Sequence, residues 1–211
     1  TANALSSQGM YSLSNYYLNL AKFLNDDFYA FDSLLAENFY NVDNFEKSKK
    51  IYSDMKKRGS AFRWYSAKQI VKILKNEKKI EKEIKVMNND FNNLDYKGIY
   101  ETFDYAEFLK RNEKYEKAID QYSELMKKIE NDHPLYSEIT DGRGVSYERI
   151  GKWKKAEKDL LDSLKVNPNQ AYVINYLAYS WIEQGINIEK SLTMLEKANK
   201  LKSNDPFIID S

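Results

Sequence analysis

A pair of residues four apart recurs along the chain at nearly constant intervals, and this period restricts the fold more than any other feature. A small residue precedes a bulky one in every pair except that of Glu83, and the pairs are Ser14 and Leu18, Ser48 and Tyr52, Glu83 and Met87, Ala118 and Tyr122, Ala156 and Leu160, and Ser191 and Leu195. Successive pairs are 34, 35, 35, 38 and 35 residues apart. A fixed period of this length is typical of stacked units that bury a continuous core between neighbours.

Each unit is predicted to be a helical hairpin, and the clearest one spans Ser137 to Pro168. Its first helix contains Gly144, its turn contains Gly151, and its second helix contains Ala156. Glycine in a helix costs about 1 kcal/mol relative to alanine. We therefore expect Gly144 to lie where a methyl group would collide with the neighbouring helix. No stretch alternates with period two over more than a few residues, so no sheet is predicted.

The turns between paired helices are rich in Asn and Gly. They are Asn41 to Asn44, Asn76 to Glu77, Asn112 to Glu113, Gly151 and Gly185. Because Asn and Gly accept the left-handed backbone that ends a helix, we expect these residues to end the first helices.

The order and spacing of Gly144, Tyr147, Ala156 and Pro168 resemble the tetratricopeptide repeat, a helix, turn and helix of about 34 residues. The resemblance implies an all-α fold, a right-handed superhelical solenoid of antiparallel helix pairs with about five repeats plus a partial one. The chain is then a single segment, residues 1–211, divided into a partial repeat at 1–27, repeats at 28–61, 62–97, 98–133, 134–169 and 170–205, and the start of a further helix at 206–211. Residues 175–181 and 205–211 also look like the repeats of bacterial multi-repeat tetratricopeptide proteins.

Both ends look cut. Residues 1–9 supply only the end of a first helix, and the apolar residues Phe207, Ile208 and Ile209 do not form the polar cap that usually ends a repeat array. We expect a segment of a longer array. No apolar run reaches the ~18 residues that span a bilayer, and no signal peptide opens the chain. A soluble protein without membrane insertion is expected, either cytoplasmic or periplasmic.

The residues that catalysis commonly needs are scarce. The chain has no cysteine and one histidine, His133, which precedes Pro134 in an inserted loop. No metal or cofactor is expected, and the chain is predicted not to be an enzyme. Asp141 and Glu148 lie two turns apart on one helix face, where they could act as acid and base. Since nothing nearby in the sequence would raise the pKa of either, we favour a hydrated acidic patch.

Nucleic-acid binding is an alternative that the charge distribution disfavours. Lys and Arg total 33 against 32 for Asp and Glu, which gives a net charge of +1. The basic residues crowd one second helix and are Lys47, Lys49, Lys50, Lys56, Lys57 and Arg58. Second helices are expected to face outward, and the first helices carry Glu37, Glu107 and Asp141 instead. An RNA-binding helical repeat remains an alternative function, although no nucleic-acid partner is expected.

A protein-binding scaffold is the favoured function. Stacked first helices line the concave groove of a solenoid, where a peptide or partner protein binds. The apolar residues of each first helix that pack against the neighbouring helices form a stripe, and the residues one or two positions beyond that stripe are expected to face the groove. These candidate groove residues are Tyr65, Lys68, Lys72, Tyr100, Phe103, Glu107, Arg111, Asp141, Val145, Glu148, Tyr172, Asn175, Tyr176 and Tyr179. The tyrosines either contact a ligand or pack against the next repeat. A partner segment that is acidic near Lys68 and apolar or basic near Tyr176 fits this order.

Two further expectations concern the partner. One subclass of tetratricopeptide domains clamps a peptide carboxylate with Lys and Asn from adjoining first helices. Lys68 is suitably placed, but Lys72 stands where the Asn would be, and Asp104 occupies the corresponding place on the next helix. The resemblance therefore does not extend to the clamp. The other alternative is a structural array that associates with itself through its exposed ends and forms a homodimer.

Overall fold

The computed structural model describes residues 1–25, 29, 31–203 and 205–209. The chain divides into two compact units, Thr1–Lys97 and Gly98–Ser211. Unit 1 contains α1 (Ala2–Ser7), α2 (Tyr11–Leu24), α3 (Asp32–Asn41), α4 (Phe45–Met55), the 3-10 helix η1 (Lys56–Arg58), α5 (Ser60–Asn76) and α6 (Ile80–Asn92). Unit 2 contains α7 (Ile99–Arg111), α8 (Tyr115–Met126), α9 (Tyr136–Arg149), α10 (Trp153–Val166), α11 (Ala171–Glu183), α12 (Ile188–Leu201) and α13 (Pro206–Ile209).

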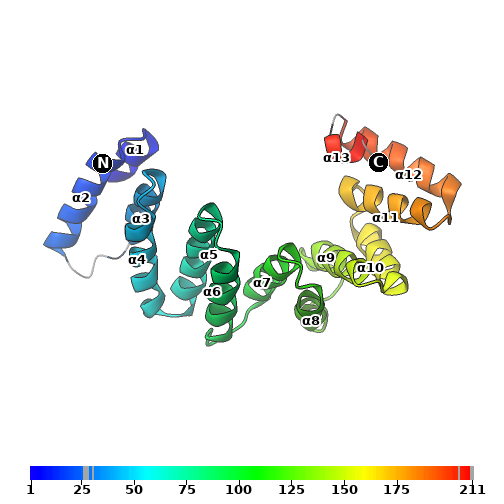
Figure 1. Ribbon diagram of the computed structural model, residues 1–211, viewed down its shortest axis with the longest axis horizontal. Coiled ribbons are helices and arrows are strands. Elements are labelled where there is room, and N and C mark those ends of the chain that lie inside the picture. The colour runs from blue at the N-terminus through cyan, green and yellow to red at the C-terminus, as the bar shows by residue number, and fades with distance from the viewer. Residues whose placement is uncertain (26–28, 30, 204, 210–211) are drawn as a thin grey trace. The chain divides into compact units, whose positions relative to one another are not determined.

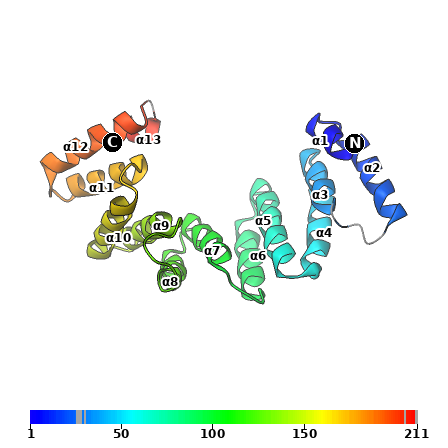
Figure 2. The same ribbon diagram turned by 180° about the vertical axis from the view of Figure 1, so that it is seen from behind.

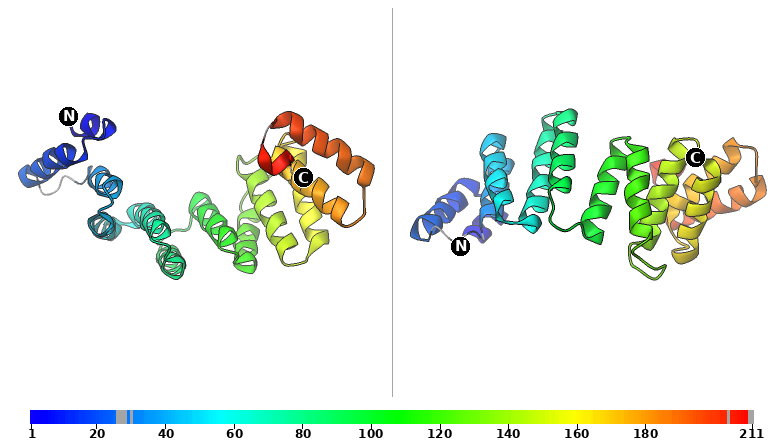
Figure 3. Two further views of the ribbon diagram at one scale, coloured as in Figure 1. Left: turned by 45° about the horizontal axis from the view of Figure 1, so that its top comes forward. Right: turned by 90° about the horizontal axis from the view of Figure 1, so that it is seen from below.

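Consecutive helices form hairpins within each unit (Figure 1). Figure 2 shows from the opposite side that α3 lies beside α4 and α5 beside α6. Figure 3 shows the same pairing for α9 with α10 and for α11 with α12. Over the residues that the structure describes there is no strand. The predicted all-α fold of helix pairs, like that of a tetratricopeptide solenoid, is confirmed.

The limits of the individual repeats stay a prediction. The expected boundary between 1–27 and 28–61 falls among residues 26–28 and 30, outside the described residues. The same holds for residues 210 and 211 of the last expected segment.

Each first helix ends in the same turn. In the hairpin of α9 and α10, Gly151 has φ 72°, and the Lys152 backbone N–H donates to the Tyr147 carbonyl at 2.8 Å. This hydrogen bond over five residues, next to a left-handed residue, is the Schellman motif. The left-handed residues of the successive turns are Gly9, Asp43, Lys78, Glu113, Gly151 and Gly185. The period therefore fixes the turns as well as the core.

The Asn residues of three turns are not the left-handed ones, contrary to the sequence expectation. Asp43, Lys78 and Glu113 hold that position instead. The geometry of the hairpin determines which residue of the turn is left-handed, and a residue other than glycine at that position is destabilised by about 1 kcal/mol.

Small residues let the two helices of a hairpin approach closely. Ala36 and Ser48 are fully buried, and the Ser48 hydroxyl donates to the Ala36 carbonyl at 2.8 Å. A methyl group added to Gly144 would lie 3.0 Å from Leu160 Cγ and 3.3 Å from the Ala156 carbonyl oxygen. The expectation that Gly144 marks a close approach is confirmed.

Candidate functional site

The predicted groove residues of unit 2 lie on its three first helices, and we call this surface the first-helix face. It consists of Tyr100, Phe103, Glu107 and Arg111 on α7, Asp141, Val145 and Glu148 on α9, and Tyr172, Asn175, Tyr176 and Tyr179 on α11. Tyr100, Tyr172 and Tyr179 are exposed by 62%, 49% and 43%. Arg111 is exposed and the others are partly buried. None of these tyrosines is a core residue, so the surface is accessible to a ligand.

Glu148 connects α9 to α11 on this face. The Tyr176 hydroxyl donates to Glu148 Oε2 at 2.6 Å, and Arg149 Nε lies 3.6 Å from the same oxygen. Burial, together with the neighbouring Glu148 carboxylate, raises the pKa of Tyr176 above its usual value. Tyr176 therefore holds a hydrogen-bonded position and stays a phenol.

Glu107 on α7 forms another polar contact, which connects this helix to α8, the second helix of its hairpin. Its Oε1 accepts a hydrogen bond from Lys110 Nζ at 2.8 Å and another from the Tyr122 hydroxyl. Tyr122 belongs to α8 and is completely buried. Burial and the Glu107 carboxylate raise its pKa. The buried tyrosine thus fixes the position of an acidic side chain on the first-helix face.

Gly142 makes room for this contact. A Cβ atom at Gly142 would lie 2.5 Å from the Tyr122 hydroxyl oxygen and 3.0 Å from Glu107 Oε1. The sequence interpretation missed the pairing of Gly142 with Tyr122. A second glycine two residues before Gly144, in the same helix, was the available signal.

The carboxyl of Asp141 behaves differently from the expectation. Burial raises its pKa to about 6, nearby Glu107 and Glu138 act in the same direction, and Lys110 opposes them. The statement that nothing nearby would raise a carboxyl pKa is therefore wrong for Asp141. The reason is that the fold brings α7 against α9 and surrounds the carboxyl with protein, which the local sequence does not show.

Among the described residues, no group of three or more His, Asp or Glu side chains is placed to hold a metal ion. His133 Nδ1 accepts a hydrogen bond from the Leu135 backbone N–H at 3.1 Å. This contact is the one expected of a loop residue that shapes its own turn.

The candidates of unit 1 lie on α5. Tyr65, Lys68 and Lys72 are all exposed. The Lys72 ammonium lies 4.5 Å from the centre of the Tyr40 ring, and the rings of Tyr65 and Tyr52 are 6.1 Å apart. Lys72 and Tyr65 thus contact aromatic rings of the preceding hairpin while remaining accessible.

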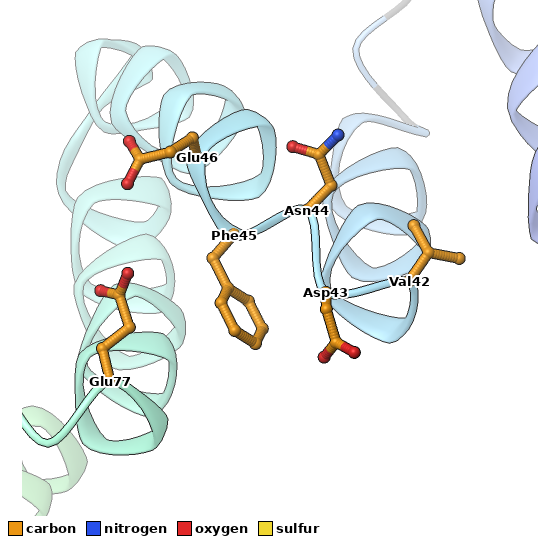
Figure 4. A pocket seen from close by; sticks show the side chains of 6 residues that line it. All are labelled: Val42, Asp43, Asn44, Phe45, Glu46 and Glu77. Atoms are coloured by element: carbon orange, nitrogen blue, oxygen red, sulfur yellow. The ribbon is translucent and has the colours of Figure 1, made fainter.

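One shallow pocket of about 370 Å³ lies at the turn between α3 and α4 (Figure 4). Figure 4 shows the Phe45 ring between Asp43 and Glu77. The acidic residues at its edge, Glu46 and Glu77, both form ion pairs with Lys49. The pocket is polar and two of its carboxylates are engaged by Lys49, so we assign no ligand to it.

The lysine-rich second helix is partly neutralised. Lys49 pairs with Glu46 and Glu77, Lys56 pairs with the buried Asp90, and Arg58 lies 2.7 Å from the buried Asp32. Binding to a phosphate backbone is driven by Lys and Arg side chains that neutralise phosphates and displace the counterions of the nucleic acid. Lys57 also pairs with Asp54 at 2.7 Å, so four of the six basic residues already have carboxylate partners, which weakens the case for RNA.

No helix within the described ranges combines the length and apolarity that crossing a membrane requires. The expected solubility and compartment stay predictions.

No protein-family model matches the chain. A curated "TPR repeat-containing protein" of Pseudomonas aeruginosa is 30% identical over 107 residues, which is 50% of this chain and 17% of that protein. The match thus covers about a sixth of the relative's length.

Solved structures share the fold at low sequence identity. MamA from Desulfovibrio magneticus has a TM-score of 0.66 at 10% identity, with 85% of this chain and 98% of that one covered. A TPR repeat-containing protein from Cytophaga hutchinsonii has a TM-score of 0.65 at 14% identity, with coverages of 95% and 77%. YrrB, described as a TPR protein with an unusual peptide-binding site, has a TM-score of 0.63 at 13% identity, with coverages of 91% and 95%. The resemblance to tetratricopeptide-repeat proteins is confirmed.

Proposed function

We propose that this chain, a tetratricopeptide-repeat protein by its repeat pattern and fold, is a non-enzymatic scaffold that binds a peptide or a segment of a partner protein on its first helices. The observation that carries the proposal is the exposure of Tyr100, Tyr172 and Tyr179 on the first-helix face of unit 2. Tyrosine gives a large contact area with few rotamers to fix, so it is enriched where binding energy concentrates. The peptide-binding site named for YrrB supports the same use of the fold.

The charges on each surface favour a partner of complementary sign. Glu107, Asp141 and Glu148 make the first-helix face of unit 2 acidic, so we expect a partner segment with Lys or Arg beside apolar residues. On α5 of unit 1, Lys68 and Lys72 favour acidic residues. The acidic face also disfavours a phosphate backbone, and RNA therefore remains the less favoured ligand.

A matched set of tyrosine variants tests this function. The partner is captured with the whole chain and purified, and its dissociation constant is then measured by calorimetry. We expect Tyr100→Ala combined with Tyr179→Ala to weaken binding at least about tenfold, because two exposed aromatic anchors are lost. Tyr96 is exposed by 78% but lies outside the helices, so Tyr96→Ala is the control and is expected to bind normally. Equal affinity of the original chain, the double tyrosine variant and the Tyr96→Ala variant would contradict the proposal.

A further inference from the structure

The outer face of α2 is apolar over its whole length. Its six residues are Leu13, Tyr16, Tyr17, Leu20, Phe23 and Leu24, and their exposed fractions run from 41% to 84%. They lie opposite the buried residues Ser14, Asn15 and Leu18. No charged side chain interrupts them, because Lys22, the helix's single charged residue, turns to the buried Asp32 at 2.5 Å. We call these six residues the α2 stripe.

At two positions of the stripe, those of Leu13 and Phe23, the other hairpins carry lysine in place of the apolar residue, with Asn92 as the one exception. Relative to the buried small residue of each hairpin, Leu13 corresponds to Lys47, Lys82, Lys117, Lys155 and Lys190. Phe23 corresponds to Lys57, Asn92, Lys127, Lys165 and Lys200. The hairpin therefore folds with lysine at these two positions, and its packing does not require an apolar residue where Leu13 and Phe23 lie. A contiguous apolar face of this kind marks an interaction surface.

The spacing of the stripe fits another helix of the same kind. Leu13, Tyr17, Leu20 and Leu24 follow one another at intervals of four, three and four residues, which is the seam of a coiled coil. Tyr16 and Phe23 flank that seam. The rings of Tyr16 and Tyr17 already pack edge to face with centroids 5.7 Å apart, so few rotamers need to be fixed on association.

From these observations we propose that the α2 stripe is a homodimer interface, in which α2 of one copy packs against α2 of a second copy about a two-fold axis. A face without charge is complementary to itself. With about 200 Å² for a large side chain, the exposed areas of the six residues add up to about 700 Å² per copy, or about 1,400 Å² in the dimer, which lies in the lower part of the range of stable interfaces. A membrane surface fits less well, because helices that lie on membranes carry many basic residues on the polar face.

Analytical ultracentrifugation of the whole 211-residue chain tests the proposal. We expect a dimer with a dissociation constant on the order of 1–10 µM, as an interface near the lower size limit gives. Leu13→Lys with Phe23→Lys copies Lys47 of α4 and Lys57 of η1, and it should raise the dissociation constant at least about tenfold while the circular dichroism stays unchanged. The control is Val166→Lys on α10, which replaces an apolar residue that is 45% exposed and lies outside the α2 stripe. It should leave the dimer intact.

A chain that stays monomeric at a protein concentration 100-fold above the expected dissociation constant would overturn the proposal. A dimer that is as stable in the Leu13→Lys, Phe23→Lys variant as in the original chain would overturn it as well. Sedimentation with neutral phosphatidylcholine vesicles, in place of dimer formation, would overturn it too.

The absence of cysteine offers a second measurement. Tyr17 lies near the middle of the stripe, so Tyr17→Cys should form an intermolecular disulfide under mild oxidation. Lys154→Cys, on the exposed side of α10, should not. Equal cross-linking at the two positions would contradict the assigned interface.

Discussion

Gly142→Ala is expected to lower the free energy of unfolding by about 2 kcal/mol, although alanine is the better helix former by about 1 kcal/mol. The new methyl group would lie 2.5 Å from the Tyr122 hydroxyl oxygen and 2.6 Å from its Cζ atom. Tyr122 is completely buried, so its ring has no free space into which to move. Urea denaturation followed by circular dichroism measures the loss.

A double-variant cycle separates this collision from a general intolerance of the helix. In a Tyr122→Leu background the ring is gone, and adding Gly142→Ala should then cost nothing or stabilise the protein. Gly144→Ala is a comparison of smaller expected effect, because its nearest neighbour, Leu160 Cγ, is 3.0 Å away. A Gly142→Ala protein as stable as the original chain would show that α8 and α9 are less tightly packed than described.

Asp141→Asn is expected to stabilise the protein at pH 8 and to have little effect at pH 4. The carboxyl pKa rises from 3.8 to about 6 on folding, so the folded state binds a proton more tightly than the unfolded state. Stability from this group is therefore lost as the pH rises from about 4 through 6, and the loss is complete above about pH 7. One pKa unit corresponds to about 1.4 kcal/mol, so the gain at pH 8 is about 2–3 kcal/mol.

Urea denaturation of both proteins at pH 4 and pH 8 measures this difference. Asp120→Asn removes an exposed carboxylate from α8 and controls for the change in net charge. A gain that is the same at both pH values would contradict the assigned cause, namely the burial of the Asp141 carboxyl beside Glu107 and Glu138.

The fold could be predicted from the sequence because one period governs both the core and the turns. The small residues of the second helices, such as Ser48 and Ala156, are buried as the pattern requires. Gly144 lies where α9 closely approaches α10, as the unfavourable free energy of a glycine within a helix indicated. The left-handed residues Gly151 and Gly185 were assigned correctly, whereas Lys78 and Glu113 were missed because neither residue type has an intrinsic preference for that backbone.

The site was predictable only in outline. The helical period places Tyr100 and Tyr179 on the accessible side of the first helices, and their exposure agrees. Contacts between helices depend on geometry that no local pattern contains, so Tyr122 with Glu107 and Tyr176 with Glu148 were not foreseen. The same applies to the raised pKa of Asp141, which depends on residues of α7.

Site-specific photo-cross-linking to the captured partner tests the central proposal most directly. A photoreactive amino acid is placed at Tyr179 on the first-helix face or at Lys158 on α10, both of which are exposed. The proposal predicts that the partner is cross-linked from Tyr179 and not from Lys158. Cross-linking from Lys158 alone would contradict it and would assign binding to the second helices.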